Sequence, residues 1–531
     1  MGRLLTSKEW ALGAAILVFA LIGLLPLCVL LADSFVSAGL IGWGNYAQTL
    51  GTARTWKLFG NSLLLAGSAT LAATLIGVPL ALLAAKSTLP LKGWLVALFC
   101  LPLLFPPYVL ANGWFQILGR QGLLSQFFGE FIGVTTSDWL FGLSGGVLVL
   151  STAYLPVVLL LTIAALDGVN PSLEDAARLC AAWPSVLGNI TLRLAAPGIA
   201  LAILLSFLLA LGEFAAPSFL RLAVFPVESF VQFSAFYNPG AAAAAASPLA
   251  AIGLLGLAVV RKWIGPGDFH FRWTRSEGGL VSFGRFDPWL CGGILAMAFT
   301  LVGLPCGALV FKGLSASAIA LAWTRAGDSL FWTLLYAALA ASAITTLGFL
   351  LGYAAQRKSI PGATLSGSLA LMLFGLPGTL IGIAVMTTWN RPALAWLYGT
   401  PALLVCAFVM QYIAVGERAA AASIAQLSPS LEEAAQIAGA GWFRRVLSIL
   451  VPLLRRPLLA VWLLVFILCM RDTSLPLLLS PPGQDTLTAR TLTLMANGSQ
   501  EMVAALCLFS MALAAVPASA ALLLLRRGRH S

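Results

Sequence analysis

The segments Asn61–Gly77 (NSLLLAGSATLAATLIG) and Trp332–Gly348 (WTLLYAALAASAITTLG) are two copies of one apolar helix. Both copies end at a glycine, and a basic residue, Lys86 or Arg357, follows each at the same distance. An α-helix needs about 20 apolar residues to cross a bilayer, because lipid offers the backbone no hydrogen-bond partners. The repeat therefore predicts a membrane protein built from two similar halves.

The composition is that of a protein embedded in lipid. Of the 531 residues, 60% are hydrophobic and only 9% are charged, whereas a soluble domain carries about 25% charged residues. This predicts an all-α polytopic membrane protein with about twelve transmembrane helices in two tandem six-helix domains. The predicted spans are residues 11–32, 61–85, 93–112, 143–166, 196–219, 243–260, 288–311, 332–355, 364–386, 399–416, 457–480 and 502–525.

The basic residues predict how the chain is oriented in the membrane. The first apolar run follows Arg3 and Lys8, as in a signal peptide, but it is longer than a signal peptide's apolar region and no small-residue cleavage site follows. We interpret it as a span. Twelve spans place both termini on one side, and most Lys and Arg residues lie in the termini and alternate loops, which predicts cytoplasmic termini. The net charge of +11 follows from this orientation, so we expect no nucleic-acid partner.

The sequence lacks the motifs of a metal centre or a catalytic cluster. Its two histidines are His270 and His530, and its eight cysteines include no Cys-x-x-Cys pair. A phosphate-binding loop requires Gly-x4-Gly-Lys-Ser/Thr, and the sequence contains no Gly-Lys dipeptide. We therefore expect no metal site, no cofactor bound by this chain and no enzymatic activity of its own.

The repeat divides the chain into two domains, residues 1–262 and 288–531. A polar, glycine-containing stretch, residues 263–287, joins them as a predicted cytoplasmic linker. Pro107 in the third predicted span corresponds to Pro377 in the ninth. A helix has to kink or break at such a proline, so both spans are predicted to be interrupted.

A second repeat lies in the predicted cytoplasmic loops, at residues 171–177 (PSLEDAA) and 429–435 (PSLEEAA). Each copy predicts a short helix capped by Ser172 or Ser430, with an acid three residues later that bonds back to the cap. Each first turn also carries negative charge that favours the positive end of the helix dipole. The alternative for each copy taken alone is a capped amphipathic turn between two spans.

The second loop resembles the signature loop of binding-protein-dependent ABC importer permeases of the type I fold. Its pattern is Glu433-Ala434-Ala435, then Gly439, Ile449, Val451 and Pro452. The first loop is looser, with Ala181 at the glycine position and one residue fewer before Ile190, so we expect the second loop to dominate coupling. The resemblance covers nearly the whole chain, which is similar to the fused two-domain permeases of ferric-iron import, with thiamine permeases as close relatives.

This resemblance implies a helix in each loop that docks into a cleft of an ATPase subunit. The implied ATPase-docking residues are Glu174, Asp175, Ala176, Ala177 and Ala181 in loop 167–195, and Glu432, Glu433, Ala434, Ala435 and Gly439 in loop 417–456. The implied partners are a cytoplasmic ABC ATPase dimer that binds ATP, an extracytoplasmic solute-binding protein and the lipid bilayer. The implied location is the bacterial inner membrane.

Two acids near the ends of predicted spans are candidates for the translocation path. Glu213 follows the acid of the first loop by 38 residues (213 − 175), and Asp472 follows that of the second by 39 (472 − 433). Two matched carboxylates facing a central path would favour a cationic cargo, and Tyr108 and Tyr154 offer further oxygen donors. The alternative is that both acids only cap their spans, with Asp472 paired to Arg471.

The resemblance implies a transport subunit whose cargo is ferric iron, and the two matched acids agree with such a cationic cargo. The same machinery would also suit thiamine, a polyamine or a phosphonate-type solute. A stand-alone secondary transporter would explain the spans and the repeat, but it would leave the two acidic loop helices without a role. A membrane enzyme is disfavoured by the absence of catalytic motifs.

Overall fold

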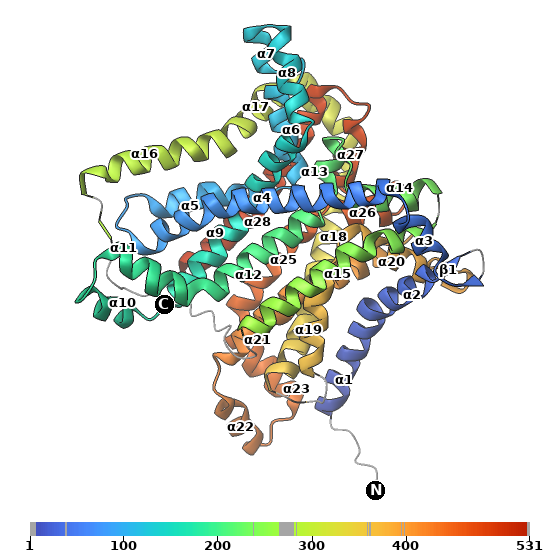
Figure 1. Cartoon of the computed structure of the whole chain (residues 1–531). Helices are drawn as coiled ribbons and strands as arrows, with labels where there is room; N and C mark the ends of the chain where they lie inside the picture. The colour runs from blue at the N-terminus through green and yellow to red at the C-terminus, as the bar shows by residue number, and fades with distance from the viewer. Residues whose placement is uncertain are drawn as a thin grey trace.

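The computed structural model describes residues 7–37, 40–236, 238–264, 281–282, 284–357, 359, 363–394, 396–397 and 399–527. Within these ranges the chain is helical apart from loops, turns, an isolated parallel bridge between Ser87 and Val281, and one small antiparallel hairpin, β1 (Val36–Ser37) with β2 (Leu40–Ile41) (Figure 1). The all-α fold class is confirmed. The predicted linker 263–287 lies mostly outside the described residues.

The first half contains α1 (Ser7–Phe19), η1 (Ala20–Leu24), α2 (Leu25–Ser34), α3 (Gly44–Leu50), α4 (Ala53–Lys86), α5 (Lys92–Cys100), η2 (Leu101–Leu103), α6 (Pro107–Leu118), α7 (Leu123–Phe128), α8 (Glu130–Leu140), α9 (Leu143–Asp167), α10 (Pro171–Arg178), α11 (Trp183–Val186), η3 (Leu187–Thr191), α12 (Leu192–Leu211), α13 (Ala215–Phe219), α14 (Phe225–Phe236) and α15 (Pro239–Ile264).

The second half contains η4 (Gly284–Phe286), α16 (Asp287–Ala298), η5 (Phe299–Gly303), α17 (Leu304–Gly313), α18 (Ala316–Gln356), α19 (Ala363–Phe374), α20 (Gly378–Trp389), η6 (Pro392–Leu394), α21 (Pro401–Ala425), α22 (Pro429–Ile437), α23 (Trp442–Arg445), η7 (Val446–Leu450), α24 (Val451–Leu453), α25 (Arg455–Arg471), α26 (Ser474–Leu479), α27 (Leu487–Met495) and α28 (Gln500–Arg527).

The described residues form 8 helices long and apolar enough to cross a membrane, or up to 12 spans when each sharply bent helix pair counts as one. The prediction of about twelve spans agrees with the upper count. The third span bends by 97° between η2 and α6, and the ninth bends by 110° between α19 and α20. These breaks fall at Pro107 and Pro377, as predicted, because proline lacks an N–H and its ring clashes with the preceding helical turn.

Irregular helix turns recur at matched places in the two halves. The π-helical turns η1 and η5 each end one residue before a Leu-Pro pair, at Pro26 and Pro305. The turns η3 and η7 each lie between a loop helix and the span that follows it. A π-turn accommodates a ring or a packing constraint that a regular α-helix cannot. The repeat therefore extends to local backbone irregularities.

The centre of each half is a long helix packed against two others. In the first half α4 lies along α9 and α12, and in the second α18 lies along α21 and α25. Gly348 of α18 sits against the backbone of α21, where an added Cβ would come within 2.6 Å of the carbonyl carbon of Gly416. Only a glycine permits this approach, which explains why the apolar repeat ends in glycine in this half.

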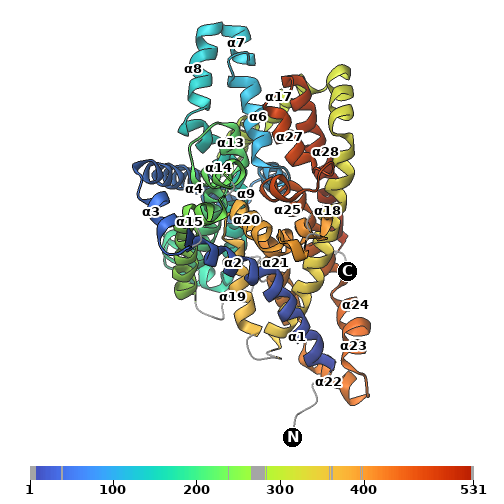
Figure 2. The same ribbon diagram turned by 90° about the vertical axis from the view of Figure 1, so that its right-hand side faces the viewer.

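The first span of each half crosses to the other half. Phe19 of α1 is buried in the core formed by α18 and α21 of the second half. Conversely, Leu309 of α17 is buried in the core that contains Trp114 of α6 in the first half. Figure 2 shows α1 and α2 lying across the helices of the second half. The two predicted domains are therefore intertwined.

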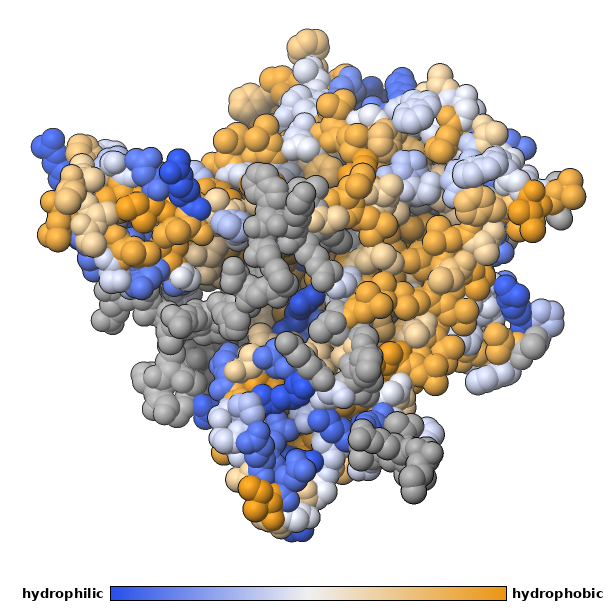
Figure 3. Space-filling view, turned by 60° about the horizontal axis from the view of Figure 1, so that its bottom comes forward, coloured by the Kyte–Doolittle hydropathy of each residue, from blue (hydrophilic) through white to orange (hydrophobic). Residues whose placement is uncertain are grey.

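The loop helices α10 and α22 lie toward the lower left of the molecule in Figure 1, and the α7–α8 hairpin projects from the top. Figure 2 also shows α22 and the α7–α8 hairpin at opposite ends of the molecule. Viewed from the loop side, hydrophilic residues gather on the projection formed by α22 and α23, while a broad hydrophobic flank lies beside it (Figure 3). This distribution suits a protein whose flank is surrounded by lipid and whose projection is in water.

Candidate coupling loops and translocation path

The loop helices α10 and α22 begin at Pro171 and Pro429. Their caps are the residues before these prolines: Asn170 accepts the N–H of Ser172, and Ser428 accepts the N–H of Ser430. The prediction that Ser172 and Ser430 are the caps is wrong. Proline is favoured at the first helical position because its fixed φ suits the helix and its missing N–H is not needed there, so the cap moves to the preceding residue.

The buried acid of the first loop is Glu174, whose side chain is 0% exposed. Lys86 at the end of α4 donates from Nζ to Oε2 of Glu174 at 2.8 Å, and the hydroxyl of Thr191 donates to Oε1 at 2.7 Å. The sequence matched Lys86 to Arg357 but did not predict that either would pair with a loop acid.

The second loop repeats this arrangement with different donors. Arg357 at the end of α18 donates from Nε to Oε1 of Glu432 at 2.9 Å, and the hydroxyl of Tyr353 donates to Oε2 at 2.7 Å. Glu432 is buried, like Glu174. Two of the four predicted docking acids, Glu174 and Glu432, thus face the protein interior. Their docking role stays a prediction that this placement does not favour.

The outer face of each loop helix combines an exposed acid with exposed apolar side chains. Asp175 and Glu433 are exposed, as are Ala176 and Ala434, while Ala177 and Ala435 are half-buried. Leu179 and Ile437 occupy matched positions and are 88% and 89% exposed. Sequence reasoning missed these two residues, although the offset of the repeat relates them. Such large exposed apolar side chains, duplicated beside an acid, indicate a surface for a protein partner.

The glycine of the signature loop has a structural role at the end of α22. Gly439 has a φ of +81°, and the N–H groups of Gly439 and Ala440 bond to the carbonyls of Gln436 and Ala435. This is a Schellman ending, which requires a left-handed residue. Ala181 in the first loop does not have a positive φ, and α10 ends one residue earlier in the repeat.

The two candidate path acids make the same contacts in each half. The hydroxyl of Tyr154 donates to Oε2 of Glu213 at 2.5 Å, and that of Tyr412 donates to Oδ2 of Asp472 at 2.7 Å. Each carboxylate also accepts a backbone N–H of the short helix that follows, α13 or α26. Each carboxylate therefore binds the first turn of the short helix that follows its span, and each also forms a pair with a tyrosine that reaches it from another span.

Arg471 lies between the two halves beside these pairs. It donates from Nη1 to the carbonyl of Leu103, 2.7 Å away in the broken third span of the other half. Its guanidinium is close enough to interact electrostatically with both Glu213 and Asp472. The expected oxygen donor Tyr154 belongs to this cluster, and Tyr108 is fully buried in the core around α6. The cluster brings two carboxylates, two phenols and one guanidinium to the interface of the halves.

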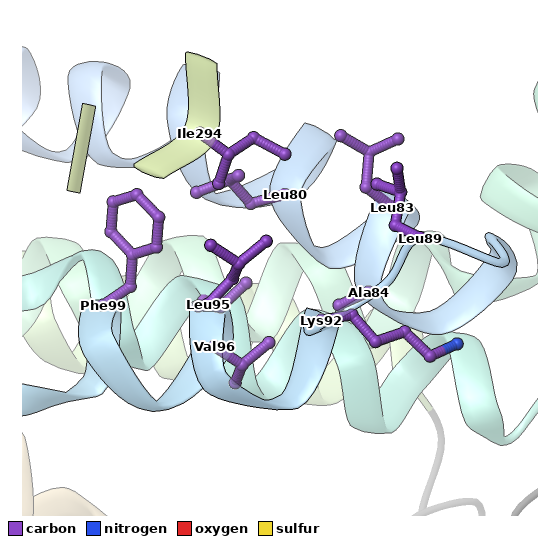
Figure 4. A pocket seen from close by; sticks show the side chains of 10 residues that line it. Leu80, Leu83, Ala84, Leu89, Lys92, Leu95, Val96, Phe99 and Ile294 are labelled. Carbon is purple, nitrogen blue, oxygen red and sulfur yellow. The ribbon is translucent and has the colours of Figure 1, made fainter. Parts of the chain in front are cut away.

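No described group of three or more His, Cys, Asp or Glu side chains is placed to hold a metal ion. A pocket between α4, α5, α9 and α16 is lined almost entirely by aliphatic side chains and Phe99. Lys92 lies at its edge and turns its nitrogen away from the apolar cluster (Figure 4). An apolar pocket of this kind offers nothing to an ionic cargo, so the tyrosine–carboxylate cluster is the better candidate for the path.

The fold and these loops define a duplicated, multi-pass membrane transport subunit. The family of binding-protein-dependent transport system inner membrane components matches residues 77–266 and 344–530, and the chain belongs to this family. It is thus the permease of an ABC importer, a multi-pass transport subunit of the inner-membrane type and not itself an enzyme.

Several curated permeases are similar to the chain. The ferric transport system permease protein FbpB of Actinobacillus pleuropneumoniae is 25% identical over 504 residues, which cover 89% of this chain and 72% of that protein. The putative ferric transport system permease protein FbpB 1 of Haemophilus influenzae is 27% identical over 448 residues, covering 79% and 69%. The molybdenum transport system permease protein ModB of Escherichia coli K12 is 33% identical over 163 residues, covering 30% and 69%.

Proposed function

We propose that this permease couples ATP hydrolysis by a separate cytoplasmic ATPase dimer to the uptake of ferric iron delivered by an extracytoplasmic solute-binding protein. Both termini and both loop helices would lie in the cytoplasm, and ATP would bind only to the ATPase. The binding protein would dock on the opposite side, from which the α7–α8 hairpin projects (Figure 1). Binding-protein-dependent permeases as a family work with such partners, which supports this assignment.

The observation that carries the coupling proposal is the duplicated outer face of the loop helices. Glu433 and Ile437 in α22 present an acid and a large apolar group to water. Asp175 in α10 and Leu179, directly after α10, present an equivalent pair. One such face is an ordinary surface feature, but two copies in matched loops fit a partner with two equivalent clefts. An ATPase dimer is a partner of this kind, and its closure would move both helices together.

Charge reversal at Glu433 combined with Ile437→Ser tests this docking face. An exposed acid and an exposed apolar anchor contribute to binding without supporting the fold, so we expect co-purification of the ATPase to fall about tenfold or more. Glu130→Lys on the exposed surface of α8 is the matched control, because it reverses an acid on the opposite side of the molecule. Undiminished ATPase recovery with the double variant would refute docking at this face.

The cargo proposal depends on the tyrosine–carboxylate cluster and on the ferric relatives. Carboxylate and phenol oxygens are ligands for a hard cation such as ferric iron, and we infer that Glu213 and Asp472 line its path with Tyr154 and Tyr412. With Arg471 between them, two ionised carboxylates leave a net negative charge. The ferric relatives match 79% to 89% of this chain, whereas the Escherichia coli molybdenum permease matches 30%. Thiamine, a polyamine or a phosphonate-type solute is the alternative cargo for the same machinery.

A further inference from the structure

Two buried ion pairs fasten the loop helices to the ends of the two longest helices in the structure. Lys86 is the last residue of α4, and Arg357 directly follows the last residue of α18. Their partners, Glu174 and Glu432, stand at the same place in the first turn of α10 and α22. The pairs are 2.8 Å and 2.9 Å long, and all four side chains are at least 86% buried.

The second oxygen of each acid accepts a hydroxyl hydrogen bond, which comes from the returning loop in the first half and from α18 itself in the second. Glu174 accepts the hydroxyl of Thr191, the last residue of the π-turn η3 that leads into α12. Glu432 accepts the hydroxyl of Tyr353, whose ring packs against the buried Trp442 of α23. The carboxylate of Glu174 therefore ties α10 both to α4 and to the return of the first loop toward the membrane. Both carboxylate oxygens of Glu432 bind the end of α18, and Arg445 of α23 donates to the backbone carbonyl of Glu432, which ties α22 to the return of the second loop.

The chain adds a further contact at each of these junctions. Val281, at the end of the linker, donates its N–H to the carbonyl of Lys86 at 2.8 Å. In the second half, Lys8 of α1 lies over the ring of Tyr353, 5.4 Å from its centroid. The first junction is thus held by the linker and the second by the N-terminal helix.

The physical chemistry of these pairs separates them from the exposed acids beside them. An exposed acid such as Glu433 costs little to replace, because water solvates either side chain. Removing one partner of a buried pair leaves an uncompensated charge inside the protein, which loosens the elements that the pair joins. In each loop, adjacent acids therefore point in opposite directions, one toward the protein and one toward water.

We propose that Glu174 and Glu432 are positioning residues that transmit movement of the loop helices to α4 and α18, and that they do not bind the ATPase themselves. This inference rests on the proposed function, since it needs a motor that pushes on the outer face of the same helices. The exposed acids Asp175 and Glu433 contact the ATPase. The buried acids Glu174 and Glu432 transmit the displacement of the loop helices to the membrane helices α4 and α18.

The test uses the full permease with its ATPase and binding protein in proteoliposomes. Glu432→Gln keeps the size of the side chain but removes its charge. We expect ATPase co-purification to remain at the level of the unmodified protein, while transported solute per ATP hydrolysed falls about tenfold. In the permease without its partners, we expect amide hydrogen exchange in α22 to accelerate while exchange in α21 stays unchanged, which excludes general unfolding.

The chain itself supplies a conservative variant. Arg357→Lys gives the second half the same residue as Lys86 in the first half. It should preserve the ion pair with Glu432 and keep the coupling ratio, the transported solute per ATP hydrolysed, near its normal value. Arg357→Met removes the charge and should behave like Glu432→Gln. Unchanged amide hydrogen exchange in α21 of Arg357→Met would separate this effect from a general loss of stability.

Two results would overturn the inference. One is loss of ATPase binding with Glu432→Gln, which would make the residue part of the docking surface. The other is unchanged exchange in α22 together with an unchanged coupling ratio, which would show that the pair does not hold the helix. If instead the unmodified permease fails to bind any ATPase, the proposed function fails. The exchange measurement on the permease alone still tests whether the ion pair between Arg357 and Glu432 holds α22 in place.

Discussion

At positions 213 and 472, the same carboxylates carry negative charge and cap a short helix, so a useful substitution has to separate the two roles. Glu213→Gln with Asp472→Asn keeps an oxygen that accepts the capping N–H and removes both charges. If a cation passes this cluster, the loss of two nearby negative charges should slow its uptake about tenfold or more, measured in proteoliposomes with the partner proteins.

The control for this double variant is Glu228→Gln, which removes an acid from the exposed pair with Arg54. Both variants should bind the ATPase normally. Full uptake by the Glu213 and Asp472 variant would show that these carboxylates only cap helices, and the cargo path would then have to lie elsewhere.

The sequence predicted part of this cluster. The register of the repeat pointed to Glu213 and Asp472, and it carried enough information to find Tyr412 as well, since Tyr412 follows Tyr154 by the same 258 residues that separate Glu432 from Glu174 (412 − 154; 432 − 174). The inward orientation of Glu432 was not predictable in this way. Glu432 and Glu433 are identical residues side by side in a short helix, so the sequence does not distinguish them. Packing against the surrounding helices determines which of the two is buried.

At the scale of elements, the ending of α22 depends on Gly439. A left-handed residue with a Cβ costs about 1 kcal/mol or more, so Gly439→Ala should fray the last turn of the helix and accelerate its amide hydrogen exchange about fivefold. Gly441→Ala is the matched control, because Gly441 has an ordinary φ of −63° and open space around it. Equal exchange in the two variants would contradict the role assigned to the Schellman ending.

The elements also show which local cues can be trusted in this chain. The breaks at Pro107 and Pro377 followed directly from the chemistry of proline and were predicted. The caps were misplaced by two residues, because a serine three residues before an acid suggested a capping box, whereas the proline at position 171 or 429 takes the first helical position. A proline next to a candidate cap therefore outweighs the capping box pattern.

At the scale of the whole molecule, the exchange of first spans between the halves was beyond the reach of sequence reasoning. Hydrophobic periodicity says that a helix is buried in lipid or protein, but it does not identify the partner helix. The predicted boundaries at 262 and 288 describe the repeat along the chain. The two regions that match the family, 77–266 and 344–530, do not include the first span of either half. In space, α1 and α17 join the two repeats.

The proposed cytoplasmic location of the first loop can be tested with a single native residue. Cys180 is exposed just after α10, on the loop side of the molecule. The other seven cysteines are first replaced by alanine. A membrane-impermeant maleimide should then label Cys180 in inverted membrane vesicles and leave it unlabelled in intact spheroplasts, because the positive-inside rule predicts that this loop is cytoplasmic. Gln126→Cys in a cysteine-free background provides the opposite control, since position 126 is exposed on the α7–α8 hairpin across the molecule. Labelling of Cys180 from outside intact cells would reverse the orientation, and a cytoplasmic ATPase would then have no access to the two loop helices.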